Sequence, residues 1–112
     1  MRNKNDPADK FEIHTFSKHH GECRIYSALQ LACAKSLESN PTVKEFITNV
    51  QMTGTEYTSD FLITYQDDSV MVQECIRLED YETPMGQHLI EQSKEYWISH
   101  GVWHWGLVVE TN

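Results

Sequence analysis

The sequence is poor in basic residues and contains no long apolar segment. It has 9 lysines and arginines against 17 aspartates and glutamates, a formal net charge of −8 at pH 7. A chain of this charge repels nucleic acid at long range, which disfavours tight DNA binding by this chain alone. No apolar run approaches the roughly 18 residues that cross a bilayer, and the N-terminus lacks the apolar stretch of a signal peptide. We therefore expect a cytoplasmic protein with no membrane partner.

Cysteine is also scarce. Cys23, Cys33 and Cys75 are odd in number, widely spaced and embedded in apolar stretches. This pattern favours reduced, buried thiols over a disulfide framework or a zinc site. The neighbouring His19 and His20 do not change this interpretation, because their spacing matches no common zinc pattern.

The length and the apolar content predict one folded domain. The chain has 112 residues, of which 39% are hydrophobic, including four Phe, five Tyr and three Trp. That is enough for a single core. Residues 1–10 are polar and show no apolar periodicity, so we expect a frayed tail there and a single domain over residues 11–112.

The first half of the domain predicts a helix followed by a strand. Apolar side chains recur at spacings of three and four between residues 22 and 39, which indicates a helix with one buried stripe. This helix is expected to end at Asn40, because the residue before a proline avoids the helical region. Residues 43–52 alternate between apolar and polar side chains, which is typical of a half-buried strand.

The second half predicts a hairpin, a helix and a last strand. Residues 60–65 and 70–77 are expected to be antiparallel strands joined by a tight turn over residues 66–69. A helix should open at Thr83-Pro84 and end at His100-Gly101. Residues 102–110 are apolar enough for a strand buried on both faces. The predicted class is α/β, a mixed sheet flanked by helices in the order α-β-β-β-α-β.

Three acidic residues could gather at one end of this sheet. Asp60 opens the second predicted strand and Glu74 lies in the middle of the third, so an antiparallel hairpin can bring them together. Carboxylate oxygens are the ligands that Mg²⁺ prefers. Glu22 would approach from the first turn of the predicted helix. Two of these residues have an alternative interpretation. Glu74 could be a surface residue of a strand with the other parity, and Glu22 could be an acid that complements the helix N-terminus.

Five segments of the sequence carry a resemblance to a known family: Leu37–Phe46, Glu56–Tyr65, Val72–Cys75, Ser93–Trp97 and Trp105–Val109. The most specific of them contains Tyr-Thr-Ser-Asp-Phe-Leu. Together with the element order, they resemble the N-terminal endonuclease domain of the transposase subunit TnsA and its short stand-alone relatives, which have the PD-(D/E)XK nuclease core. The resemblance covers roughly residues 15 to 110.

The resemblance implies a metal-dependent, single-strand DNA cut made within a larger assembly during transposition. Asp60 would be the principal ligand of Mg²⁺ or Mn²⁺, and Gln73 or Glu74 would be the second ligand. Glu22 would be the carboxylate of the helix. A phage or other mobile element is the expected source of such a protein.

The chain departs from this family at the catalytic lysine. The family places a lysine two residues after the second ligand, where it orients or deprotonates the attacking water. Those positions hold Cys75 or Ile76 here. Arg77 could stabilise phosphate charge but cannot act as a base. Lys94 could reach the site from the second helix, although a solvated surface position is the commoner role for such a lysine.

Three functional hypotheses follow. The first is a magnesium- or manganese-dependent DNA endonuclease that acts with a protein partner supplying DNA binding or targeting. A homodimer is one option for its assembly. The second is a catalytically degenerate nuclease-fold protein, for example a phage or mobile-element inhibitor or adaptor that binds a protein or DNA. The third is an inactive fragment of a mobile-element gene. Trp97, Trp103 and Trp105 could stack on bases, but helix and strand periodicity accounts for Trp97 and Trp105, which favours core packing.

Overall fold

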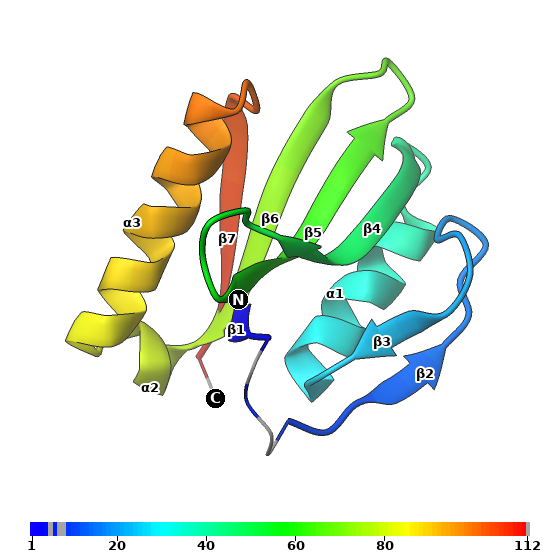
Figure 1. Cartoon of the computed structure of the whole chain (residues 1–112). Coiled ribbons are helices and arrows are strands. Elements are labelled where there is room, and N and C mark those ends of the chain that lie inside the picture. Colours follow the sequence, from blue (N-terminus) through cyan, green and yellow to red (C-terminus); the bar gives the residue numbers. More distant parts are fainter. Residues whose placement is uncertain (5, 7–8, 112) are drawn as a thin grey trace.

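The computed structural model, which describes residues 1–4, 6 and 9–111, is a mixed α/β fold. Four strands lie side by side in the order β4-β5-β6-β7 (Figure 1). Strand β5 runs antiparallel to both β4 and β6, and β7 runs parallel to β6. The α/β class with a mixed sheet is therefore confirmed. The strand bounds are Val43–Gln51 for β4, Tyr57–Tyr65 for β5, Val70–Arg77 for β6 and His104–Glu110 for β7.

Helix α1 spans Ala28–Ser39, so the expectation of a helix from residue 22 was wrong for its first six residues. Cys23–Ile25 forms strand β3, which pairs with β2 (Glu12–His14) in a separate hairpin. Cys23 and Ile25 are buried while Arg24 between them is exposed, an alternation of period two that only a strand can satisfy. The helix begins after Ser27, whose side chain accepts a hydrogen bond from the Gln30 N–H at 3.0 Å.

The central hairpin follows the prediction closely. Strand β6 has the predicted bounds, and the side chain of Asp67 accepts a hydrogen bond from the Ser69 N–H at 3.0 Å in the turn. Strand β5, however, begins at Tyr57, so Asp60 lies inside the strand and does not open it. In β4, Asn49 has a left-handed φ of 55°, and the register of β4 against β5 shifts between Val43 and Glu45.

Hydrogen bonds fix both ends of the long helix that precedes the last strand. A short helix, α2 (Leu78–Tyr81), precedes α3 (Pro84–Ser99), and the Thr83 hydroxyl caps α3 by accepting from the Gly86 N–H at 3.0 Å. Beyond α3, the Val102 N–H donates to the Trp97 carbonyl at 2.9 Å. Strand β7 was expected to be buried on both faces, but it is mostly half-buried, because among the described residues β6 is its only strand partner.

Two apolar clusters lie on opposite faces of the sheet. Alternate residues of β5 separate them, since Phe61 and Ile63 belong to one cluster and Leu62 packs against the other. The first cluster joins the sheet to α1 and β3, and the second joins it to α3 through Trp97 (Figure 1). The sheet therefore lies between α1 on one side and α3 on the other.

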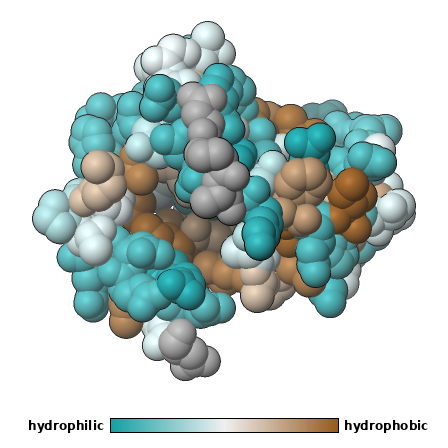
Figure 2. Space-filling view, turned by 60° about the horizontal axis from the view of Figure 1, so that its bottom comes forward, coloured by the Kyte–Doolittle hydropathy of each residue, from teal (hydrophilic) through white to brown (hydrophobic). Residues whose placement is uncertain are grey.

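The N-terminal residues contribute to the sheet. Of residues 1–10, for which a frayed tail is predicted, Arg2–Asn3 forms the short strand β1 beside the start of β5. Residues 5, 7 and 8 lie outside the described residues. The face shown in Figure 2 is mixed in character, with hydrophilic residues among separate apolar patches. None of the described helices has the length and apolar character needed to cross a membrane.

Candidate metal centre

Strands β5 and β6 separate at Asp60, and this separation creates the candidate site. The two strands pair from Phe61↔Gln73 to Thr64↔Val70, whereas Tyr57 and Thr58 pair with β1. We call the point of separation, Ser59–Asp60 on β5 and Glu74–Cys75 on β6, the β5–β6 fork.

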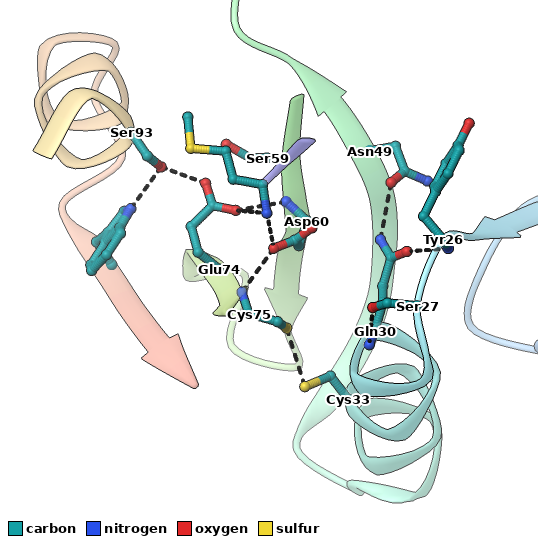
Figure 3. Close-up of polar contacts among 12 residues, drawn as sticks. Tyr26, Ser27, Gln30, Cys33, Asn49, Ser59, Asp60, Glu74, Cys75 and Ser93 are labelled. Carbon is teal, nitrogen blue, oxygen red and sulfur yellow. Dashed lines mark hydrogen bonds and ion pairs between the residues drawn. The ribbon is translucent and has the colours of Figure 1, made fainter. Parts of the chain in front are cut away.

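Side chains replace the missing ladder bonds in the fork. The Asp60 N–H donates to Glu74 Oε1 at 2.8 Å, and the Cys75 N–H donates to Asp60 Oδ2 at 2.8 Å (Figure 3). Each carboxylate is thereby oriented by the backbone of the opposite strand. The structure thus brings Asp60 and Glu74 together, as the predicted hairpin required.

Both carboxylates face the same cation, the α-amino group of Met1. This ammonium group forms an ion pair with Asp60 Oδ2 and lies 3.7 Å from Glu74 Oε1 (Figure 3). Asp60 is 7% exposed and Glu74 is 1% exposed. A buried acidic pair is costly without a compensating positive charge, so the ammonium group stabilises the fork electrostatically.

Burial shifts the pKa values in this cluster. Burial raises the pKa of Glu74 to about 7, and the negative charge of Asp60 adds to this effect, while the Met1 ammonium opposes it. Burial alone would lower the pKa of the Met1 α-amino group, but the attraction of Asp60 and Glu74 outweighs it and raises that pKa. Near neutral pH the carboxyl group of Glu74 is therefore only partly ionised.

A hydrogen-bonded chain from α3 and β7 supports Glu74 on its other side. The Ser93 hydroxyl donates to Glu74 Oε2 at 2.5 Å, and the Trp105 indole N–H donates to the Ser93 hydroxyl at 3.0 Å (Figure 3). The neighbouring Trp97 indole N–H donates to the Ser59 hydroxyl at 2.7 Å. Both Trp97 and Trp105 are thus held inside the molecule by the residues of the fork and its supports.

Replacing Ser93 by alanine is expected to lower the free energy of unfolding by about 2 kcal/mol, because Glu74 Oε2 and the Trp105 N–H both lose their partner in a buried region. Urea denaturation followed by tryptophan fluorescence measures the change. Ser99→Ala, an exposed serine near the end of the same helix, is the matched control and should stay within about 0.5 kcal/mol of the wild type. Equal stability of the two variants would contradict the role given to Ser93.

Stability is expected to depend on pH through Glu74. Its pKa is about 7 in the folded chain against an ordinary 4.5, so the folded state holds a proton that the unfolded state has lost. This contribution is complete below the ordinary pKa and disappears as the pH rises through about 7. The free energy of unfolding should fall by on the order of 3 kcal/mol across this window.

Denaturation at a series of pH values tests this, with Glu74→Gln as the variant that removes the titration and Glu91→Gln as an exposed control on α3. The decline with pH should flatten in Glu74→Gln only. A stability that rises with pH in the wild type, or the same decline in all three proteins, would count against a raised pKa at Glu74.

The remaining predicted site residues lie elsewhere. Glu22 is exposed in the segment before β3, not in a helix, and lines a separate surface hollow with Arg2 and Arg24. The expectation that it points inward from a first helical turn is therefore wrong, because that turn does not exist.

The two candidate cations for catalysis also have other partners. Arg77 is paired with Glu79 and Asp80 at the start of α2. Lys94 lies 4.0 Å from Glu91 and over the ring of Trp105, with its side chain 43% exposed. Gln73 is paired in register with Phe61 of β5. Among the described contacts, none joins these three residues to the two carboxylates of the fork.

Two features of the site were not found from the sequence. Gln30 is 2% exposed on α1 and bonds Asn49 of β4 at 3.0 Å, so the polar residue that this helix buries is Gln30 and not Glu22. The Cys75 thiol donates to Cys33 Sγ at 3.2 Å, which links the fork to α1. This bond raises the pKa of Cys75 and lowers that of Cys33. The only sequence signal for this arrangement was Ser27 as a capping residue. It would have moved the predicted start of the helix from residue 22 to residue 28 and put Gln30 in the first turn.

The donor set of the fork fits a hard divalent cation. Asp60 Oδ2 and Glu74 Oε1 already converge on one positive charge. Among the described residues, no group of three or more His, Cys, Asp and Glu side chains is arranged to hold a metal ion. Two carboxylates are nevertheless a usual protein contribution to a Mg²⁺ site, in which waters and substrate phosphate complete the octahedron.

Comparison with known proteins does not assign this chain to a family. No protein-family model matches this chain, and no curated protein matches it.

Proposed function

We propose that this chain is a metal-dependent DNA endonuclease of the PD-(D/E)XK type that works within a complex. The observation that supports this best is the convergence of Asp60 and Glu74 on one cation at the β5–β6 fork. The order α1-β4-β5-β6-α3-β7 agrees with such a core, and the resemblance to TnsA-like nucleases supplies the reaction class. The net charge of −8 makes a partner that supplies DNA binding part of the proposal.

The two carboxylates of the fork would hold the metal ion, and their hydrogen-bond partners would orient them. A bound Mg²⁺ or Mn²⁺ would stabilise the charge that develops on the scissile phosphate and lower the pKa of a bound water. Asp60 and Glu74 would hold that ion, with Asp60 fixed by the Cys75 N–H and Glu74 fixed by Ser93. Glu74 must lose its proton to do so, and the Met1 ammonium must leave the fork.

A second function has its own support at Ile76. This residue lies two positions after Glu74 on β6, where the TnsA-like family has its catalytic lysine, and an aliphatic side chain cannot accept a proton. A catalytically degenerate nuclease fold that binds a protein or DNA partner, as a phage or mobile-element inhibitor or adaptor does, is the alternative.

Two measurements on the purified 112-residue chain separate these functions. Mn²⁺ binding is followed by the loss of the free-ion paramagnetic resonance signal, and cleavage by nicking of supercoiled plasmid. The endonuclease proposal predicts both, with nicked circles as the product because each event cuts one strand. Binding without nicking favours the degenerate alternative. Absence of Mn²⁺ binding at millimolar concentration would contradict the proposed metal centre, and the endonuclease proposal would fail with it.

A further inference from the structure

A polar hollow of about 410 Å³ opens on the surface close to the β5–β6 fork. Its residues come from β1, β3, β4 and β5, from the segment before β3, and from the residues that directly follow β1 and β3. Thr58 connects the two regions, because it lies two residues before Asp60 on β5, a rise of about 6.6 Å along the strand. Arg2, which pairs with Thr58, directly follows Met1 in the chain. The lining of the hollow includes Arg2, Lys4, His19, Arg24, Asn49 and Thr58.

The hollow collects positive charge on an acidic molecule. Arg2, Lys4 and Arg24 line it, three of the nine basic side chains of the whole sequence, against one acidic side chain, Glu22. The whole chain has a net charge of −8, so an average region of its surface would be acidic. The hollow has the opposite balance of charged side chains. Such a concave basic site attracts anions.

Both arginines are held in place by aromatic rings. The guanidinium of Arg2 lies 3.8 Å from the centre of the Tyr26 ring, and that of Arg24 lies 4.6 Å from the centre of the Phe11 ring. Arg2 also forms an ion pair with Asp9 through Nε at 2.8 Å, and this contact fixes its guanidinium beside the hollow. Stacked guanidinium groups are the usual donors for phosphate oxygens because their fork of N–H groups matches phosphate geometry.

Two polar atoms beside the hollow have no hydrogen-bond partner within the described structure. They are Thr58 Oγ1, on a residue only 5% exposed, and His19 Nδ1. The other ring nitrogen of His19 is engaged with the Thr48 hydroxyl at 3.3 Å. A buried polar atom without a partner costs about 1–3 kcal/mol, so such atoms mark places where a ligand supplies the missing bond.

The backbone at the edge of the hollow is strained as well. Asn49 has φ 55°, a conformation that is uncommon for a residue other than glycine, and its amide groups are fixed by Gln30 and by the Arg24 carbonyl. Strain of this kind is found at ligand sites more often than elsewhere.

From these contacts we infer that the polar hollow binds a phosphate group of a DNA strand, next to the position at which the fork would act. The identity of the strand as DNA rests on the proposed function, whereas the preference for phosphate rests on the hollow alone. The bound phosphate oxygens receive hydrogen bonds from Arg2, Arg24 and Thr58, with Lys4 adding charge at the rim. The hollow thereby positions a strand whose neighbouring phosphate lies towards Asp60.

Fluorescence anisotropy of a labelled short single-stranded DNA, measured in EDTA, tests this inference without a metal ion. The double variant Lys4→Gln/Arg24→Gln should weaken binding by about tenfold or more. Lys35→Gln/Lys44→Gln carries the same charge change on other surfaces and should weaken it by less than about threefold. Thr58→Val removes the hydroxyl at constant charge and nearly constant shape, and should also weaken binding. Equal affinities of both double variants would overturn the inference.

Further outcomes separate this inference from the proposed function. Asp67→Asn, which removes an exposed carboxylate outside both the hollow and the fork, should keep its affinity for DNA in EDTA. If the wild type nicks plasmid but the hollow variants bind DNA normally, the inference fails and the endonuclease stands. In an amide chemical-shift titration with inorganic phosphate, Asn49 and Thr58 should respond. A response to inorganic phosphate without any DNA binding would overturn the assignment to a nucleic-acid strand.

Discussion

Replacing Asp60 by asparagine is expected to weaken Mn²⁺ binding by at least about 100-fold and to abolish plasmid nicking, because a neutral amide cannot supply the charge that a hard cation requires. The amide oxygen can still accept the hydrogen bond from the Cys75 N–H, so the local backbone should be preserved. The Met1 ammonium loses its main partner, which should reduce stability without changing the fold. Paramagnetic resonance of free Mn²⁺ and the plasmid assay measure the two effects.

Asp67→Asn is the matched control for this experiment. Asp67 is an exposed carboxylate in the β5–β6 turn, where it bonds Ser69, so its removal changes the net charge equally without touching the fork. Its Mn²⁺ affinity should remain within about twofold of the wild type. A nicking activity that survives in Asp60→Asn would show that the cut belongs to a contaminating nuclease or to another site.

Replacing Ile76 by lysine is expected to increase the rate of Mn²⁺-dependent nicking by on the order of 100-fold. Ile76 and Glu74 lie two residues apart on β6, so their side chains share one face of the strand, and both line a small pocket with Met1. A lysine at this position would bring an amine towards the water that the fork is proposed to activate. The initial rate of formation of nicked circles measures the gain.

Cys75→Lys distinguishes the two possible alignments of the catalytic lysine. If Gln73 were the second ligand, the missing lysine would correspond to Cys75. The Cys75 thiol, however, contacts Cys33 of α1 on the other face of the strand, so a lysine there should bring no gain. A gain in Cys75→Lys and none in Ile76→Lys would assign the second ligand to Gln73 and overturn the assignment to Glu74.

Local signals account for the parts of the fold that the sequence predicted. The turn between β5 and β6 and the cap of α3 depend on residues adjacent in the chain, Asp67 with Ser69 and Thr83 with Gly86, and both were found from their sequence patterns. The meeting of Asp60 and Glu74 followed from the hairpin alone. Their role as metal ligands stays a prediction.

The errors arose where long-range contacts decide the structure. Residues 23–25 carry spacings that a helix could continue, but the pairing of β3 with β2 imposes a strand there. Because residues 23–25 form a strand, Glu22 does not reach the fork. The same error in the predicted helix start is the reason that Gln30 was not identified as the buried polar residue of α1. The filling of the fork by Met1 depends on contacts between residues 59 and 73 positions apart, and no periodicity in a sequence encodes such a meeting.

The burial of the Met1 amine has a practical consequence for the laboratory. A purification tag fused ahead of Met1 would convert this ammonium into an uncharged amide and bring extra chain to a position where the amine is almost fully enclosed. A tagged preparation would then carry two acids in the fork without their counter-ion. Its metal affinity and thermal behaviour would differ from those of the 112-residue chain, so affinity handles belong at the other terminus.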